Sequence, residues 1–537
     1  MAMDMEITLI LKPEQENNFS FIKSLLSKEI KKKGWTVEDD FCFNPVKRSV
    51  DARHGQVKLV IRYKIFSSKD SESQGPKIPQ WKKADDKKTV IIVGAGPAGL
   101  FGALKLLEYG IKPLIIERGS ETSKRKRDIA AISTKDIVNP DSNYCFGEGG
   151  AGTFSDGKLY TRSNKRGDIS QILSIFAHFG ADKNILTDAH PHIGTNRLPQ
   201  IINNMREKII ELGGEFYFDT RVTSLIFEES DTKKVKGVVC KNTFDGTERS
   251  FFADSILLAT GHSATDIYMM LAKEAPESLE AKTFAIGVRV EHPRKTIDEI
   301  QYHGQSAKNL GAAEYRVTAQ VKERGVYSFC MCPGGFVVPS ASEDEGIVVN
   351  GMSACARNSA WSNAAIVVET RPEDIPQKFK DEAKKQGCDA LAGLLFRTEL
   401  EKLAKNHGKG QAAPAQKLTD FLENKLSENL PETSYTPGIV SSNLNEWIPP
   451  QIATRLADGF REINKNMKGF ICKDALMIAI ETRTSTPLRI LRDKESLESP
   501  FIKGLYPSGE GSGYSGGIVS SAMDGENVCK KIAKNLQ

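Results

Sequence analysis

Three glycines and one glutamate have the types and spacing that bind the phosphates and ribose of a dinucleotide. The glycine-rich motif consists of Gly94, Gly96, Pro97, Ala98 and Gly99, directly after the β-branched run of residues 89–93. The first glycine permits a tight turn, the second lets the backbone approach a pyrophosphate, and the third lets helix and strand pack closely. The helix that follows, predicted to end at Gly110, presents free N–H groups to the phosphates.

Glu117 ends a second predicted strand, residues 112–116, and lies eighteen residues after Gly99. A carboxylate at this position accepts a hydrogen bond from a ribose hydroxyl and repels a 2′-phosphate. Arg118, which follows it, joins the candidate set. This context makes the motif a specific signal, but it does not distinguish NAD from FAD.

A second glycine-rich segment, near the carboxy terminus, indicates FAD rather than NAD. A predicted strand, residues 501–506, leads to Gly509, Glu510, Gly516, Gly517 and Ile518 and then to a helix. This order resembles the last motif of two-part FAD folds, in which an acidic residue holds the ribityl chain and a helix start meets the flavin. A helix amino terminus stabilises the negative charge of a reduced flavin. The predicted cofactor is FAD, bound non-covalently.

Two further segments support an FAD site. Residues 255–258 read as a strand that ends in Ala259, Thr260 and Gly261, which resembles the "ATG" element of the same fold class. The loop of residues 147–157 is too rich in glycine for a helix or strand, and it resembles loops that run against a flat cofactor. The candidates there are Gly152, Thr153, Ser155, Asp156 and Lys158, and Val222 completes the set. A purely structural turn is the alternative for the loop.

The chain also resembles a family. Residues 146–159, 330–335, 350–353 and 481–487 are similar to strings of the uncharacterised bacterial FAD-dependent dehydrogenase family, also called NAD(FAD)-utilizing dehydrogenases. The resemblance covers nearly the whole chain, including residues 47–53. It implies FAD binding and a redox activity, and it brings no agreed substrate.

Several other polar residues have two interpretations each. Arg483 and Arg489 either flank the flavin or bind an anionic substrate group, or they are solvated or core-bridging arginines. His262 either approaches the flavin or is a capping or core histidine, and we favour the second. His190 and His192 are too isolated for a metal site, and we expect none.

Three cysteines are candidates for thiol chemistry at the flavin. Cys330 and Cys332, one residue apart, are expected on the same face of a strand and differ from the CxxC of flavin disulfide reductases. We expect them to be small buried hydrophobes, and Cys145 is a weaker thiol candidate still.

The alternating strands and helices predict an α/β protein. Its expected class is a Rossmann-like FAD-binding domain with an inserted α+β domain and a small N-terminal βαββ, ferredoxin-like domain. The N-terminal strands are expected near residues 6–11, 36–43 and 57–65, with a helix over 14–31. The expected divisions are 1–66, a linker at 67–88, the first FAD-binding part at 89–281, the inserted substrate or cap domain at 282–468 and the second FAD-binding part at 469–537. The insert is expected to be strand-rich to about residue 369 and mostly helical over 372–468.

Composition narrows the functional classes. The 537 residues carry a net charge of +5, which gives little reason to expect a nucleic-acid partner. No signal sequence and no apolar stretch near roughly 20 residues is visible, so we expect a cytoplasmic protein without a membrane partner. Nine cysteines suit reduced thiols. The sequence does not fix the oligomeric state.

These observations favour an FAD-dependent oxidoreductase that transfers a hydride between flavin N5 and a small organic substrate, held between the FAD-binding domain and the insert. Only one dinucleotide motif is visible, so NAD(P)H, if it is the donor, visits transiently. The catalytic acid or base is not readable. Two alternatives stay open. The βαββ module and the basic residues 31–33 and 47–48 would suit a flavin-dependent RNA-modifying enzyme. A non-catalytic flavin-bound scaffold or redox sensor is the other, and turnover with any electron donor would argue against it.

Overall fold

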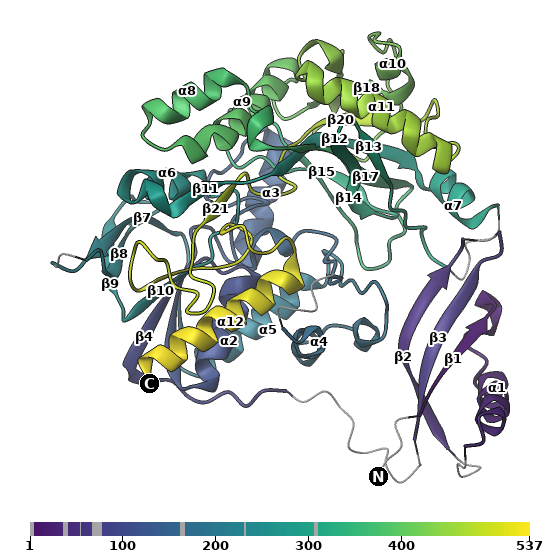
Figure 1. Cartoon of the computed structure of the whole chain (residues 1–537), viewed down its shortest axis with the longest axis horizontal. Helices are drawn as coiled ribbons and strands as arrows, with labels where there is room; N and C mark the ends of the chain where they lie inside the picture. Colours follow the sequence, from purple (N-terminus) through teal and green to yellow (C-terminus); the bar gives the residue numbers. More distant parts are fainter. Residues whose placement is uncertain are drawn as a thin grey trace.

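A five-stranded parallel sheet forms the centre of the predicted FAD-binding half of the chain (Figure 1). The computed structural model describes residues 5–35, 41–53, 55–66, 78–161, 167–229, 232–304 and 310–537. The strands, in spatial order, are β22 (Leu505–Pro507), β10 (Ser255–Leu258), β4 (Asp85–Val93), β5 (Ile111–Ile116) and β6 (Glu215–Tyr217). Parallel strands buried on both faces are typical of a doubly wound α/β domain, and the predicted class is confirmed.

Two boundaries differ from the prediction. The strand expected over residues 501–506 is shorter and later, because the chain turns at Gly504, where φ is +80°, before pairing begins at Leu505. The strand expected from residue 89 begins at Asp85, within the predicted linker. Residues 67–77 of that linker lie outside the described residues.

Helices α2 (Pro97–Glu108), α12 (Ile518–Leu536), α4 (Ile169–His178) and α5 (Leu198–Glu211) pack together on one face of this sheet (Figure 1). Small residues let α2 and α12 approach closely, since a Cβ on Gly525 would lie 2.0 Å from the carbonyl oxygen of Ala98. The two glycine-rich motifs, more than 400 residues apart, are thereby brought together at one end of the sheet.

The other face of the parallel sheet is covered by an antiparallel meander. Its strands are β7 (Thr220–Phe227), β8 (Val235–Asn242) and β9 (Glu248–Phe252). Two helices complete this half of the chain, α3 (Thr122–Lys135) and α6 (Thr265–Glu274).

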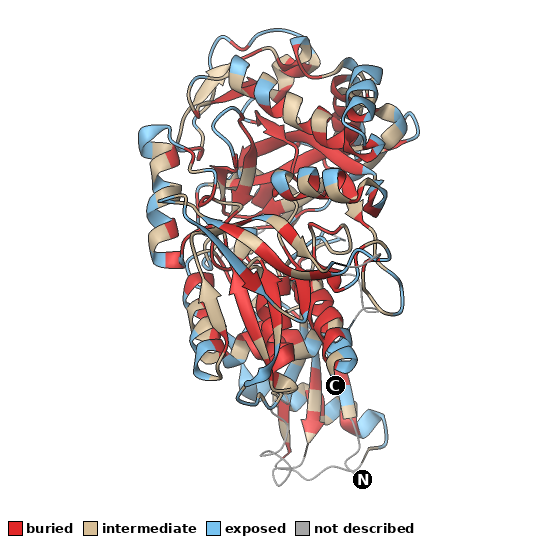
Figure 2. Cartoon of the chain, turned by 90° about the vertical axis from the view of Figure 1, so that its left-hand side faces the viewer, coloured by how far each residue is buried: buried red, intermediate tan, exposed pale blue. Residues whose placement is uncertain are grey.

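The insert is built on a seven-stranded sheet. Its order is β13 (Thr318–Val321), β14 (Arg324–Cys332), β17 (Trp361–Thr370), β12 (Phe284–Pro293), β20 (Leu476–Glu481), β18 (Ala413–Lys417) and β19 (Ile439–Ser441). The helices of the insert are α7 (Arg294–Tyr302), α8 (Gln377–Lys385), α9 (Ala392–His407), α10 (Leu418–Leu422) and α11 (Pro450–Asn466). Figure 1 shows α8, α9 and α11 above this sheet, while its other side faces the FAD-binding half; Figure 2 shows the buried strands of both sheets between helices whose outer faces are exposed.

The helical prediction for residues 372–468 missed β18 and β19. Their sequences, APAQK and IVS, are too short to show alternation, and β18 is a strand because it pairs with β20 and β19. β20 itself lies beyond the predicted boundary at residue 468, so the sheet of the insert extends to Glu481. Two small sheets join β11 (Leu279–Ala281) to β21 (Leu488–Ile490) and β15 (Phe336–Pro339) to β16 (Val349–Met352).

The N-terminal segment has the predicted βαββ order. It consists of β1 (Met5–Leu11), α1 (Phe19–Lys32), β2 (Cys42–Asp51) and β3 (Lys58–Phe66), with β3 in the middle of an antiparallel sheet. The strand expected over residues 36–43 is displaced to Cys42–Asp51; residues 36–40 lie outside the described residues. The backbone of Arg48 exchanges hydrogen bonds of 2.8 Å with Thr187 and Ala189, which docks β2 onto the FAD-binding half.

The helices described here include none that is both long and apolar enough to cross a membrane.

His292, in β12, is a buried titratable group at the centre of the insert. Its Nε2–H donates to the carbonyl oxygen of Phe470 at 2.8 Å, and Nδ1 has no partner among the described residues. Burial lowers the pKa of His292 from 6.5 to about 4. The folded chain therefore holds the neutral imidazole.

This depressed pKa predicts a loss of stability in acid. The unfolded chain binds a proton near pH 6.5 and the folded chain does not, so stability is complete above that pH and falls as the pH falls toward about 4. Between pH 6.5 and about pH 5 the contribution of His292 to the free energy of unfolding should fall by about 2 kcal/mol. Urea unfolding at both pH values should show a smaller loss for His292→Gln than for the wild type. His407→Gln, on the outer helix α9, should match the wild type, and an equal loss in all three proteins would contradict the assignment.

Candidate cofactor and substrate site

A cavity of about 960 Å³ lies between the carboxyl end of the parallel sheet and the sheet of the insert. Ligands of open α/β sheets bind outside the carboxyl ends of the strands. Nearly all the residues predicted for the cofactor line this cavity, namely Gly94, Gly96, Pro97, Ala98, Glu117, Arg118, Gly152, Ser155, Asp156, Lys158, Val222, Ala259, Thr260, Gly261, Arg483, Gly509, Glu510, Gly516, Gly517 and Ile518. The structure thus brings together segments from the whole length of the chain.

Gly99 and Thr153 belong to the predicted set but do not line the cavity. A Cβ on Gly99 would lie 2.0 Å from the carbonyl oxygen of Gly94, so this glycine allows α2 to pack on the loop. Thr153 is buried and donates to the carbonyl oxygen of Glu148 at 3.0 Å. Both residues support the walls of the cavity from behind.

The glycine positions fit a flat, phosphate-bearing cofactor. A Cβ on Gly96 would meet nothing closer than the Cα of Gly150, at 3.8 Å, and a Cβ on Gly516 would meet nothing within 4 Å. Side chains at these positions would therefore project into open space rather than into protein. The amino termini of α2 and α12, whose first N–H groups have no intrahelical acceptor, open on the same cavity. An anionic ligand is stabilised at such helix ends.

Gly94 has the separate task of making the turn. Its φ is +106°, a conformation that residues with a side chain rarely adopt, and a Cβ there would lie 2.5 Å from the carbonyl oxygen of Ala259. The loop between β4 and α2 therefore requires glycine for its own geometry.

Glu117 does more than the sequence indicated. Its buried carboxylate accepts hydrogen bonds from the backbone N–H groups of Ala95 at 2.8 Å, Gly119 at 3.0 Å and Gly147 at 2.9 Å. It thereby ties the glycine-rich motif to the loop that begins at Gly147. A carboxylate offers about four acceptor positions, so one remains for a ribose hydroxyl.

Arg118, the residue after Glu117, is held by carboxylates. Its guanidinium donates to Asp141 at 2.8 Å and to Asp266 at 3.0 Å, and it lies over the ring of Phe146. This arrangement fixes the Arg118 side chain in the cavity wall.

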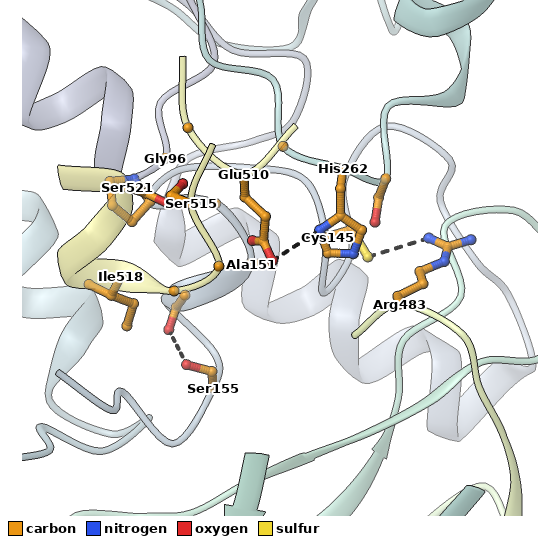
Figure 3. Close-up of a pocket in the computed structure, with 18 of the residues that line it drawn as sticks. Gly96, Cys145, Ala151, Ser155, His262, Arg483, Glu510, Ser515, Ile518 and Ser521 are labelled. Carbon is orange, nitrogen blue, oxygen red and sulfur yellow. Dashed lines mark hydrogen bonds and ion pairs between the residues drawn. The ribbon is translucent and has the colours of Figure 1, made fainter. Parts of the chain in front are cut away.

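His262 and Glu510 point toward one another in the middle of the cavity wall (Figure 3). The His262 Nδ1 and Glu510 Oε1 atoms are 3.4 Å apart, and Nε2 of His262 is buried without a partner among the described residues. The favoured interpretation of His262 as a capping or core residue is therefore wrong, because its ring faces the predicted acidic residue of the C-terminal motif.

Arg483 and Arg489 differ in their surroundings. Arg483 grips the buried carboxylate of Glu401 with two donors, at 2.7 and 3.1 Å, and also donates to Ser342 at 2.7 Å. It is a core-bridging arginine whose edge reaches the cavity, and each of its three side-chain nitrogens already donates a hydrogen bond within the protein. Arg489 lies off the cavity and pairs with Glu280 at 2.8 Å. Neither geometry supports the hypothesis of an anionic substrate held by these two arginines.

A charged cluster lines the end of the cavity near the insert. Asp156 accepts from Arg357 at 2.7 Å and lies 3.4 Å from the ammonium of Lys158. Burial alone would raise the pKa of Asp156, but Lys158 and Arg357 outweigh it and lower the pKa. Asp156 is therefore an anion that holds two cations at this end.

His190 lies at the same end of the cavity, although no motif in the sequence pointed to it. Its Nδ1 lies 3.2 Å from Glu314, and this hydrogen bond is the main cause that raises the pKa of His190. Both residues line the cavity. The segment that carries His190 is the one on which β2 of the N-terminal domain docks.

Glu481, at the end of β20, is a further residue that sequence reasoning missed. It lines the cavity, is 1% exposed, and accepts from Arg289 at 2.9 Å. Burial raises the pKa of Glu481, and Arg289 offsets part of that effect. A carboxyl group with a raised pKa at a cavity wall is suited to proton transfer. Its place in the string of residues 481–487 was the only signal in the sequence.

The cysteine prediction is half right. Cys332 is fully buried, as expected of a small hydrophobe, but Cys330 lines the cavity. The two residues do not follow regular strand alternation, because Cys330 has φ of +43° and the pairing with β17 shifts register between Phe329 and Cys332. Such a bulge was not visible in the sequence.

Several parts of the chain match known protein families. Residues 87–135 and 158–287 match families described as an FAD binding domain, and residues 283–484 match the family "FAD-dependent protein, C-terminal domain-like". Residues 3–66 match a domain of unknown function, DUF8436.

Among solved structures, the chain is similar to a geranylgeranyl bacteriochlorophyll reductase-like protein from Thermoplasma acidophilum, with 12% identity, coverage of 84% of this chain and 79% of the other, and a TM-score of 0.34. Quinol fumarate reductase FrdA from E. coli is 11% identical, with coverage of 83% and 70% and a TM-score of 0.34. CtdE, solved in complex with FAD, is 12% identical, with coverage of 84% of both chains and a TM-score of 0.32.

One curated relative is much more similar. An uncharacterized protein of Clostridium beijerinckii is 38% identical over 535 residues, which cover 96% of each chain. The likeness therefore extends through the N-terminal domain, both FAD-binding parts and the insert.

Proposed function

We propose that this chain, which belongs to the same family of FAD-dependent proteins as the C. beijerinckii relative, is an oxidoreductase that transfers a hydride between FAD and a small polar substrate at the insert end of the cavity. The observation that carries the proposal is that one continuous cavity is lined at one end by both glycine-rich motifs and at the other by the charged cluster of Asp156, Lys158 and Arg357. Catalytic sites combine a cofactor pocket with a few convergent polar groups in this way.

The two ends have different tasks. Gly96, Glu117 and the starts of α2 and α12 would hold the pyrophosphate, ribose and flavin portions of FAD. When bound, FAD supplies hydride transfer at its flavin ring. The protein's share is to orient the substrate, exclude water and move protons.

The residues of the insert end suit these tasks. Lys158 and Arg357 are fixed by Asp156, so their donors are oriented before a substrate arrives, which lowers the cost of binding. Glu481 and His190 are two groups there that could hold or release a proton. A substrate with a carbonyl, carboxylate or hydroxyl group fits this set of donors and proton carriers.

We propose NAD(P)H as the electron donor. The described residues form one five-stranded parallel sheet and no second one of this kind, so the nicotinamide would bind transiently at the same cavity rather than on a second dinucleotide domain.

Anaerobic rapid mixing of the FAD-loaded protein with NADH and, separately, with NADPH tests the proposal. We expect one of the two to bleach the visible flavin band, and small carbonyl and enoate compounds can then be screened for the return of that band. A loaded protein that neither nicotinamide reduces would contradict the donor, and it would direct the screen to substrates that reduce FAD themselves.

A further inference from the structure

We propose that Cys330 and Cys332 form a redox-active dithiol at the insert end of the cavity, closing to a disulfide and reopening as electrons pass to and from FAD. The proposal rests on the proposed function only in taking FAD as the electron partner. The pairing of the two thiols stands on the geometry of β14.

The backbone presents the two cysteines to one another. Cys330 has φ of +43°, which is uncommon for a residue with a side chain and marks a local departure from the strand. The Cys332 thiol donates to the carbonyl oxygen of Cys330 at 3.3 Å, so its side chain folds back toward the other cysteine. The bulge thus turns two residues of a strand into neighbouring thiols.

Two cations hold the same tripeptide. The ammonium of Lys158 donates to the carbonyl oxygen of Met331, between the cysteines. Arg289 donates to the carbonyl oxygen of Cys330 at 2.9 Å, and its Nη1 lies 4.0 Å from the Cys332 Sγ. Positive charge next to a thiol favours the thiolate, which is the reactive form.

The pKa values of the pair agree with this geometry. The hydrogen bond from Cys332 lowers the pKa of Cys330 most, and Lys158 and Arg289 lower it further against the opposing effect of burial. The same hydrogen bond and burial raise the pKa of Cys332. Cys330 is therefore the more acidic thiol of the pair.

The two cysteines differ in their access to the cavity, and this difference assigns them different roles. Cys330 lines the cavity, whereas Cys332 lies behind it and is fully buried. Cys145 also lines the cavity, but its Sγ donates a hydrogen bond to the carbonyl oxygen of Ser340 and accepts one from Arg483, and it faces no second thiol among the described residues. Cys330 is therefore the thiolate that meets the reacting partner, and Cys332 is the thiol that closes the disulfide.

The step balances with FAD as the oxidant. The Cys330 thiolate and the Cys332 thiol lose two electrons and one proton as the S–S bond forms and the Cys332 S–H bond breaks. With FAD bound, those two electrons and that proton would pass to the flavin, which is the oxidant that the step requires. The reverse step opens the disulfide.

Oxidant treatment followed by mass spectrometry tests the dithiol. The Cys355→Ser protein is treated with diamide, its remaining thiols are alkylated, and the tryptic peptide that carries residues 325–357 is fragmented. We expect a disulfide that joins Cys330 and Cys332, with a loss of two alkylatable thiols. Cys330→Ser and Cys332→Ser should each prevent that loss, whereas Cys145→Ser should leave it unchanged. Independent alkylation of Cys330 and Cys332 after oxidation would overturn the proposal.

The link to FAD needs a second readout. The oxidised, FAD-loaded protein is photoreduced anaerobically and its thiols are counted, and we expect two more than in an unilluminated sample. An unchanged count would overturn the electron exchange. Failure to bind FAD would instead refute the proposed function, and it would appear in the flavin absorbance while the disulfide measurement stays readable.

Discussion

Gly96→Leu is expected to weaken FAD binding by at least about 100-fold while the protein without FAD keeps its stability. Gly96 has φ of −77° and ψ of −175°, which any residue can adopt, and a Cβ there meets no atom closer than 3.8 Å. The leucine side chain would therefore fill the space at the start of α2 that the pyrophosphate needs. A 100-fold change corresponds to about 2.7 kcal/mol of binding free energy. Titration with FAD, followed by absorbance or flavin fluorescence, measures the dissociation constant.

Gly94→Ala provides the contrast. Gly94 has φ of +106°, and its Cβ would lie 2.5 Å from the carbonyl oxygen of Ala259, so alanine should lower the unfolding temperature even without FAD. If Gly96→Leu bound FAD as tightly as the wild type, the glycine-rich motif would not contact the cofactor. If both variants lost stability equally, the effect of Gly96→Leu would be one of folding.

Glu117→Ala should lower both the stability of the protein and its affinity for FAD, because the Glu117 carboxylate holds the backbone of the cavity wall. The substitution leaves three buried backbone N–H groups, those of Ala95, Gly119 and Gly147, without their acceptor. An unsatisfied buried donor costs roughly 1–3 kcal/mol, so we expect a loss of about 3 kcal/mol or more in the free energy of unfolding. Because two loops of the cavity are released together, FAD affinity should also fall at least about tenfold. Urea unfolding and FAD titration measure the two effects.

Two control variants test whether these losses come from the hydrogen bonds that the Glu117 carboxylate accepts. Glu121→Ala removes an exposed carboxylate four residues later and should change stability by less than about 0.5 kcal/mol. Glu117→Gln keeps one acceptor oxygen and should fall between the wild type and Glu117→Ala in both measurements. Unchanged FAD affinity in Glu117→Ala would remove this residue from the cofactor site.

The FAD-binding half was predictable because its signals are local. A β-branched run, a glycine motif and a terminal glutamate lie within 30 residues of one another, and each follows from a physical need of the dinucleotide fold. The C-terminal motif has the same local character. The cavity lining accordingly includes Gly94, Gly96, Glu117 and Glu510 as expected.

The residues at the insert end of the cavity were harder to predict from the sequence, because strand pairing between distant segments brings them together. Glu481 reaches the wall only because β20 joins the sheet of the insert, and Arg289 meets it from the neighbouring strand β12. Cys330 is turned toward the cavity by a bulge that no periodicity reveals. β18 likewise exists as a strand through its partners rather than through the preference of its sequence.

The contact between the N-terminal domain and the cavity could not be predicted for the same reason. The edge of β2 pairs with residues 187–189, which lead directly to His190. Residues more than 130 positions apart are thereby joined, and the small domain supports one wall of the insert end.

The most direct test of the central claim is a crystal structure of the protein loaded with FAD. We expect the pyrophosphate at Gly96, the ribose within hydrogen-bonding distance of Glu117, and the flavin ring facing the end of the cavity formed by Lys158 and Cys330. FAD bound outside this cavity, or a flavin ring turned away from the insert, would contradict the account.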